Sequence, residues 1–209
     1  MKIESPKLKN LEEKKLEDII PNNKIENSIF NNNIDINLSL KNIEIDTCIF
    51  KDINFSNINL LNVDMYDVIF ENCDLSNQVF DNQTMYRVIF KNCKLVGTTF
   101  INASLKDIEF IESKVTFANF TETRMTNINI IDSDFTESTF METIIKKINL
   151  EETNFNKTEF IKVKLTNVDF KTCNITNTIF DIESLKGIIV SPIQCPYLVN
   201  MLGIKVNYN

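Results

Sequence analysis

An unbroken period of five residues runs through most of this 209-residue chain and leaves few folds open to it. Every residue whose number is a multiple of five, from Leu40 to Leu185, is Leu, Ile, Phe, Met or Val. All but one of the 16 phenylalanines share this register, and only Phe117 lies outside it. The period fits neither the 3.6 residues of a helical turn nor the two-residue alternation of a flat strand. The chain must therefore turn a corner every five residues.

The positions between these large apolar residues are also restricted. The residue two before each of them is mostly small or β-branched, as at Cys48, Val63 and Ala103, which suits an interior corner. The remaining positions are mostly Asn, Asp, Glu, Lys, Thr and Ser. Because the chain has only 3 glycines, we expect asparagine to form many of the corners, since its short polar side chain tolerates a positive φ.

Several five-residue units closely match the pattern A(D/N)LXX. They are CDLSN (73–77), ANFTE (118–122), SDFTE (133–137) and TNFNK (153–157). In these units the chain resembles the pentapeptide-repeat family, and the resemblance extends over roughly residues 40–185. It implies an all-β solenoid, a right-handed quadrilateral β-helix with four units in each 20-residue coil.

The resemblance divides the chain into three parts. We expect an N-terminal cap segment (1–27), the pentapeptide-repeat β-helix (28–190), and a C-terminal helix and strand (191–209) that cap the solenoid or join two subunits. A solenoid needs such caps because its end coils would otherwise expose the core.

One pair of segments shows how the coils stack. MYDVIFENCDL (65–75) returns as MYRVIFKNCKL (85–95), and the three positions that differ all reverse charge. Like charges on adjacent coils repel, so an alternation of sign fixes the register of the coils. We expect charge ladders at Asp67–Arg87–Asp107, Lys51–Glu71–Lys91, Asp74–Lys94 and Glu151–Lys171.

Gln78 and Gln83 are large amides at positions that should face the interior. Two interpretations remain open. The amides bond backbone carbonyls within a local bulge, or the face around them is deformed for binding a partner.

The N-terminal end of the repeat is expected to carry a helix. Residues 8–20 place Leu8, Leu11, Leu16, Ile19 and Ile20 on a rough helical face, and Pro21 would stop that helix.

The C-terminal tail also predicts a helix. Ser191 is placed as N-cap, Pro192 as the first helical residue and Gly203 just past the end, before a short strand at Ile204–Val206. The tail resembles the C-terminal helix of the quinolone-resistance branch of the family, which implies a homodimer joined through this helix. The candidate interface residues are Tyr197, Leu198, Met201 and Leu202. The alternative is a cap that covers only its own last coil.

The composition argues against catalysis. The chain has no histidine, and its glycines lie only at positions 97, 187 and 203, so it contains neither a P-loop nor a GxSxG or GxGxxG motif. Cys73, Cys93 and Cys173 share one interior column and are interpreted as small hydrophobic residues. We therefore predict no enzyme, no cofactor and no metal site.

The remaining bulk properties concern location and partners. Five cysteines without a CxxC pair, no secretory signal and no long apolar run favour a cytoplasmic protein. The net charge of −7 argues against direct binding to nucleic acid.

Resemblance to the quinolone-resistance branch implies a different role, that of a DNA mimic. Such a protein would bind a type II topoisomerase (DNA gyrase or topoisomerase IV) at its DNA site and alter its activity or drug sensitivity. The candidate partner-binding residues form two acidic columns, Glu112, Asp132 and Glu152 on one and Glu122 and Glu142 on the other. The alternative is a pentapeptide-repeat interaction scaffold with another protein partner, suggested by outward apolar residues such as Tyr66, Ile69 and Phe117.

Overall fold

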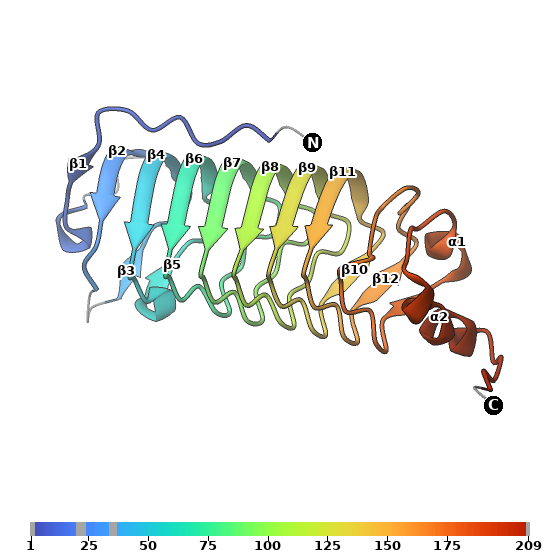
Figure 1. The fold of residues 1–209 in the computed structure, drawn as a ribbon. Helices are drawn as coiled ribbons and strands as arrows, with labels where there is room; N and C mark the ends of the chain where they lie inside the picture. Colours follow the sequence, from blue (N-terminus) through green and yellow to red (C-terminus); the bar gives the residue numbers. More distant parts are fainter. Residues whose placement is uncertain (1–2, 20–23, 34–36, 208–209) are drawn as a thin grey trace.

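A computed structural model describes residues 3–19, 24–33 and 37–207 as a β-solenoid with a short C-terminal helix (Figure 1). Its long face is a parallel sheet of eight strands in the order β1-β2-β4-β6-β7-β8-β9-β11. The strands are β1 (Glu12–Glu13), β2 (Lys24–Phe30), β4 (Glu44–Lys51), β6 (Asp64–Glu71), β7 (Thr84–Lys91), β8 (Ser104–Ile111), β9 (Arg124–Ile131) and β11 (Ile144–Glu151). From β2 to β11, neighbouring strands pair with an offset of 20 residues, as in Met65 with Met85, whereas β1 pairs with β2 at an offset of 16, as in Glu12 with Ser28. The expected β-helix is confirmed.

The other faces carry shorter strands and isolated bridges. One small sheet contains β10 (Thr139–Met141), β12 (Glu159–Ile161) and β13 (Ile179–Phe180), and another pairs β3 (Leu38–Ser39) with β5 (Ile58–Asn59). A 3-10 helix, η2 (Phe55–Asn57), precedes β5. Bridges such as Asp74 with Lys94 and Val79 with Thr99 keep the same 20-residue offset.

The corners of the coils use left-handed backbone at every fifth residue. Positive φ values recur from Asn42 through Asn177, almost always at residue numbers that end in 2 or 7. Of the 27 described non-glycine residues with positive φ, 12 are asparagine, more than any other residue type, which confirms its expected role at the corners. Two further corners use Gly97 and Gly187. Four corners per 20-residue coil follow from this spacing.

The interior contains columns of stacked side chains. Phe30, Phe50, Phe70, Phe90 and Phe110 form one column, with ring centroids 5.1–5.2 Å apart. Phenylalanines on the opposite column stack likewise, and all these rings are fully buried. A stacked ring contributes more than its buried area alone, because offset aromatic contacts add to it.

The small interior positions also satisfy the backbone. The Thr123 hydroxyl donates to the Phe100 carbonyl at 2.6 Å, and Ser138 donates to Val115 at 2.7 Å. The thiol of Cys93 contacts the Phe70 carbonyl in the same way. Each of these contacts joins a residue to the carbonyl 23 positions before it, so the pattern repeats along the rod.

Gln78 and Gln83 follow this rule with longer side chains. The Gln78 amide donates to the carbonyls of Phe55 and Ile58, and the Gln83 amide donates to those of Leu60 and Val79. The interpretation as carbonyl-bonded amides is confirmed, although no residue is inserted there, since the 20-residue offset continues. Gln78 also lines a surface groove, so a binding role for this face stays a prediction.

The N-terminal helix predicted for residues 8–20 is wrong. The described part of that stretch contains the strand β1, which pairs with β2, and one 3-10 turn, η1 (Leu16–Asp18). Leu16 is buried and serves as the cap residue, while Ile20 and Pro21 lie outside the described residues. The helical pattern failed because pairing with β2 offers the backbone a tertiary partner that a helix would forgo.

The C-terminal helix is confirmed and begins irregularly. Ser191 caps a 3-10 turn, η3 (Pro192–Gln194), which continues as α2 (Cys195–Met201), and Gly203 follows with φ +75°. The buried Gln194 amide donates to the carbonyls of Phe170 and Cys173, which closes the last coil. The strand expected at Ile204–Val206 is absent from the structure, and a short helix, α1 (Ile182–Leu185), precedes the tail.

Candidate protein-interaction surfaces

The first predicted acidic column lies at one corner of three consecutive coils. Glu112, Asp132 and Glu152 are exposed and have left-handed backbone, with φ values of 51°, 46° and 46°. The Glu112 and Asp132 amides each donate to a carbonyl of the next coil at 3.0 Å. Among the described residues, none of the three carboxylates forms an ion pair. The structure therefore brings these three predicted residues together as a stack of unpaired charge.

The same corner is built differently in earlier coils. Asn92 donates to Asn72, and Asn72 donates to Asp52, each at 2.8 Å, which forms a ladder of side-chain amides. Glutamate cannot form such a ladder, because an ionised carboxylate has no hydrogen to donate to the carboxylate of the next coil. Left-handed backbone also disfavours residues other than Gly, Asn and Asp. The backbone is thus unfavourable at Glu112 and Glu152, and the three stacked carboxylates repel one another.

The second acidic column is partly neutralised. Glu122 and Glu142 stack at an exposed, left-handed corner, above a ladder in which Asn102 donates to Asn82 at 2.9 Å. The Glu142 carboxylate lies 2.6 Å from the Lys162 ammonium, and this pairing raises the pKa of Lys162. Glu122 alone keeps an unpaired carboxylate in this column, which makes it the weaker of the two candidate surfaces.

The predicted charge ladders are confirmed only in part. Glu71 lies between Lys51 and Lys91, at 3.5 and 3.6 Å, and Asp74 pairs with Lys94 at 3.6 Å. The Glu151–Lys171 ladder is wrong, because the Lys171 ammonium lies 3.1 Å from Asp169, two residues earlier in the chain.

The ladder at the centre of the rod forms only one of its two expected rungs. Arg87 makes a bidentate pair with Asp67, with Nη2 2.6 Å from Oδ2. The Asp107 carboxylate instead accepts from Asn127 at 3.0 Å and from the Glu4 amide at 3.2 Å. The guanidinium directs Nε and Nη2 to Asp67 and has Nη1 3.7 Å from Glu4, and no ion pair joins it to Asp107 in the described part of the chain.

The C-terminal helix exposes three of its four predicted interface residues. Tyr197, Met201 and Leu202 face solvent, and Leu202 is 56% exposed. Leu198 packs against the core, so it acts as part of the cap. Ile193, which the sequence did not single out, is 79% exposed and adds to the apolar surface of this end.

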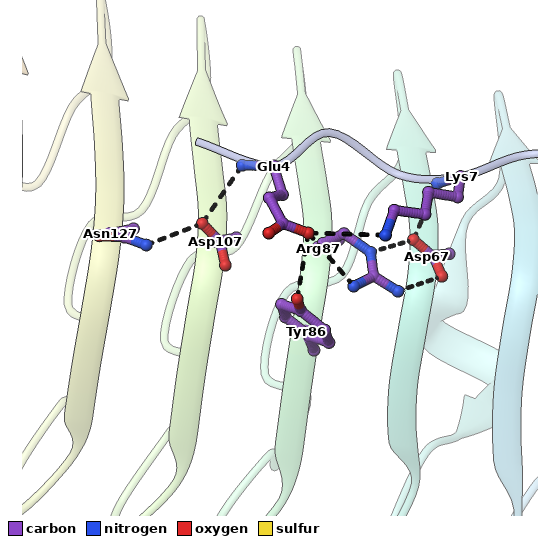
Figure 2. Close-up of polar contacts among 7 residues, drawn as sticks. All are labelled: Glu4, Lys7, Asp67, Tyr86, Arg87, Asp107 and Asn127. Atoms are coloured by element: carbon purple, nitrogen blue, oxygen red, sulfur yellow. Dashed lines mark hydrogen bonds and ion pairs between the residues drawn. The ribbon is translucent and has the colours of Figure 1, made fainter. Parts of the chain in front are cut away.

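The structure adds a surface that the sequence did not reveal. Residues 3–11, here called the N-terminal strap, run along the outside of the eight-stranded sheet (Figure 1). Glu4 and Lys7 contact residues of β6, β7 and β8 (Figure 2). The charges at Asp67, Arg87 and Asp107 were visible in the sequence, but their contact with residues 60–103 positions away was not.

The other features of the described residues that bear on chemistry are the interior thiols and a surface groove. Burial raises the pKa of the Cys48 thiol to about 11 and also raises that of Cys173, which disfavours reactive thiolates. Within the part of the chain that the structure describes, the groove beside η2 and β5 has Lys41 as its one charged lining residue. In the described ranges, no three Asp, Glu, Cys or His side chains gather closely enough to hold a metal ion. None of the described helices is long and apolar enough to span a membrane.

Similarity to solved structures is distant. A trypsin-treated form of QnrB1, a plasmid-mediated fluoroquinolone resistance protein, shares 24% identity, with 96% of this chain and 98% of that chain covered and a TM-score of 0.49. HetL, a pentapeptide repeat protein involved in heterocyst differentiation regulation in Nostoc sp. strain PCC 7120, shares 15% identity over 79% of this chain and 84% of that chain, with a TM-score of 0.37.

Family models give the clearest relation. No curated protein matches the chain. A model described as the SV2A/B/C luminal domain matches residues 9–100. Two pentapeptide-repeat models match residues 63–140 and, in overlapping segments, 133–181, which together span more than half of the chain. With its five-residue corners and 20-residue coils, the chain belongs to the pentapeptide-repeat family.

Proposed function

We propose that this protein is a non-enzymatic, DNA-mimic-like protein that binds a type II topoisomerase, DNA gyrase or topoisomerase IV, and modulates its activity or drug sensitivity. The observation that carries the proposal is the unpaired stack of Glu112, Asp132 and Glu152 at a left-handed corner. Asparagine would be more stable there, as the same corner shows in earlier coils. Three stacked carboxylates, two of them on glutamates in left-handed backbone, destabilise these coils, and a surface role would explain why they occur there.

The spacing of the carboxylates in this stack suits binding to a partner protein whose usual ligand is DNA. Adjacent coils are about 4.8 Å apart, so the column presents a carboxylate at about that interval. One strand of B-DNA presents a phosphate about every 3.4 Å. Residues 101–160 hold 11 acidic and 6 basic side chains, so this part of the rod is net negative. A positively charged DNA-binding groove would therefore attract this face.

The proposal is tested by a gyrase supercoiling titration. The test variant carries Glu112→Asn, Asp132→Asn and Glu152→Asn, because asparagine removes the charge and fits the left-handed corner. The native protein should inhibit supercoiling, added salt should weaken that inhibition, and the variant should inhibit at least tenfold less. The control carries Glu12→Gln, Glu13→Gln and Glu26→Gln, which removes the same charge at the other end of the rod, and it should inhibit like the native protein.

A dimer through the C-terminal end forms part of the proposal. Ile193, Tyr197, Met201 and Leu202 would lie in that interface, since they leave an apolar surface exposed beside α2. The combination Ile193→Arg and Leu202→Arg should yield monomers in sedimentation, whereas the native chain should sediment as a dimer at micromolar concentration. Leu198 is left intact because it packs on the core.

The second candidate function is an interaction scaffold with another protein partner. Phe117 favours it, since this aromatic residue is 55% exposed at a corner with φ 60°. Exposed aromatic residues are frequent anchors of protein interfaces. The two functions differ in the supercoiling titration: inhibition indifferent to the acidic triple variant, or no inhibition at all, would support the scaffold.

A further inference from the structure

The N-terminal strap lies on the outer face of the sheet like a bound peptide (Figure 2). Its path crosses the strands, and its two anchors lie two coils apart. The Lys7 amide donates to the Asp67 carboxylate at 2.8 Å, and the Glu4 amide donates to the Asp107 carboxylate at 3.2 Å. Both acceptors belong to one corner column, at the middle of β6 and β8.

The spacing of these two anchors follows from general geometry. An extended chain advances about 3.3 Å per residue, so the three steps between Glu4 and Lys7 span about 10 Å. Two coils of the solenoid are also about 10 Å apart. Any extended segment can therefore offer a backbone amide to both carboxylates, whatever its side chains are.

Selectivity for the side chain comes from Tyr86 and Arg87, here called the clamp, which contact Glu4 between the two anchors. The Tyr86 hydroxyl donates to the Glu4 carboxylate at 3.2 Å, and the Arg87 Nη1 lies 3.7 Å from the same oxygen. The hydrogen bond from Tyr86 lowers the pKa of Glu4, despite some opposing desolvation. Arg87 and Lys106 also lie over the Tyr86 ring, at 3.8 and 4.6 Å from its centroid. The clamp thus accepts a carboxylate side chain and disfavours a cation.

The receptor side of this contact is far more buried than the strap. With the strap in place, Asp67 and Asp107 are only 7% and 2% exposed, although they lie on the outer face of the solenoid. The side chains of Glu4 and Lys7, by contrast, remain about half or more exposed, at 52% and 63%. A segment held by so few contacts can be displaced, whereas a buried carboxylate strongly favours keeping a donor in place.

We propose that the face formed by Asp67, Tyr86, Arg87 and Asp107 is a docking site for an extended peptide segment of a partner protein, and that the strap occupies it as an internal competitor. The partner segment has a glutamate where the strap has Glu4, and it offers backbone amides at that residue and three residues later. This site is separate from the acidic columns, so it does not depend on topoisomerase binding.

The test measures binding of a fluorescein-labelled peptide with the sequence of residues 2–10, KIESPKLKN, by anisotropy. The receptor is the full chain carrying Glu4→Lys, whose strap is repelled by Arg87. The peptide should bind this variant at least tenfold more tightly than it binds the native chain, where the strap competes. The same peptide with glutamine in place of its glutamate should bind the variant at least fivefold more weakly.

A second receptor variant checks the clamp with little risk to folding. Adding Tyr86→Phe to Glu4→Lys removes one hydroxyl and should weaken peptide binding severalfold, while the melting temperature stays within a few degrees. The proposal is overturned if the Glu4→Lys variant binds no peptide at concentrations up to about 1 mM. This limit is chosen because a tethered segment has an effective concentration of roughly that size. It is also overturned if neither the glutamine substitution in the peptide nor Tyr86→Phe in the receptor changes the peptide affinity. A loss of sedimenting mass on Glu4→Lys would mean that the strap docks on a second copy, which would overturn the assignment to a partner.

Discussion

The coils before Asp107 and the coils that follow it build the same corners from different residues. In the earlier coils asparagine dominates the left-handed positions, and the amides of Asn62, Asn92 and Asn102 each donate to the coil before. Between residues 107 and 162, the non-glycine corners are mostly Glu and Lys, and Asn127 is the single asparagine among them. The 20-residue offset is nevertheless unchanged. The backbone register therefore does not depend on asparagine, and the later corners are free to carry charge.

The interiors of the two regions differ as well. The earlier coils fill the small positions with residues such as Val63, Val68 and Cys93, whereas the later coils use hydroxyls such as Thr123, Ser138 and Thr158. The hydroxyls donate to backbone carbonyls at 2.6–2.7 Å. Stacked rings continue through both regions, as at Phe120, Phe140 and Phe160. The regions differ because the earlier corners add amide ladders and the later interior adds buried hydroxyl hydrogen bonds.

The largest expected effect breaks the aromatic column of the earlier coils. Phe90 is fully buried between Phe70 and Phe110, at 5.2 Å from each ring. Phe90→Ala should lower the free energy of unfolding by about 3–5 kcal/mol. Ile130 continues this column in the later coils, and Ile130→Val should cost only about 0.5–1.5 kcal/mol. Urea unfolding of both variants checks this, and equal losses would contradict the stacking argument.

Low pH should destabilise the centre of the rod, because Asp67 becomes protonated there. Burial by itself raises the pKa of this carboxyl, but hydrogen bonds from Arg87 and from the Lys7 amide outweigh burial and hold the pKa below its ordinary value of 3.8. The stabilisation from a lowered pKa is complete above that value and is lost as the pH falls below it. The melting temperature of the native chain should therefore fall more steeply below about pH 4 than that of Asp67→Asn. Parallel curves would rule out this contribution.

A corner of the earlier coils should be sensitive to loss of its amide. Asn92 donates to Asn72 at 2.8 Å and has φ 51°. Asn92→Ala removes the bond and leaves alanine in left-handed backbone, so it should cost about 1–2 kcal/mol. Glu112→Ala, at the same corner one coil later, should change stability by less than about 0.5 kcal/mol. If both substitutions cost the same in chemical denaturation, the two regions do not differ as described.

Restoring asparagine should stabilise the later coils. The variant with Glu112→Asn, Asp132→Asn and Glu152→Asn would extend the amide ladder and remove the stacked charge. We expect a gain of about 1–2 kcal/mol in the free energy of unfolding, largest at low salt. Loss of gyrase inhibition together with this gain would separate function from folding, whereas a destabilised variant would mean that the carboxylates support the fold.

The smallest expected effect concerns Phe117. It is largely exposed, with φ 60°, so its ring gains little from burial while its backbone is unfavourable. Phe117→Asn should raise the free energy of unfolding by about 0.5–1 kcal/mol. Thermal unfolding measures this, and a decrease would show that the ring packs against the neighbouring coils after all.

The features that repeat locally could be predicted before the fold was known. The five-residue register predicted the buried columns and the corners, because each coil presents the same pattern to its neighbours. Ser191 and Pro192 predicted the start of the C-terminal helix, because a cap depends only on adjacent residues. The positions of Glu112, Asp132 and Glu152 in one column followed from the same 20-residue arithmetic.

The contacts that do not repeat could be identified only in the folded chain. It replaced the helix expected at residues 8–20 by a strand and a strap, paired Arg87 with Asp67 rather than with Asp107, and turned Leu198 toward the core. Each outcome depends on competition among partners that lie in other coils or at the far end of the chain. A local pattern cannot express that competition, because the free energy of such a contact belongs to the pair and not to either segment alone.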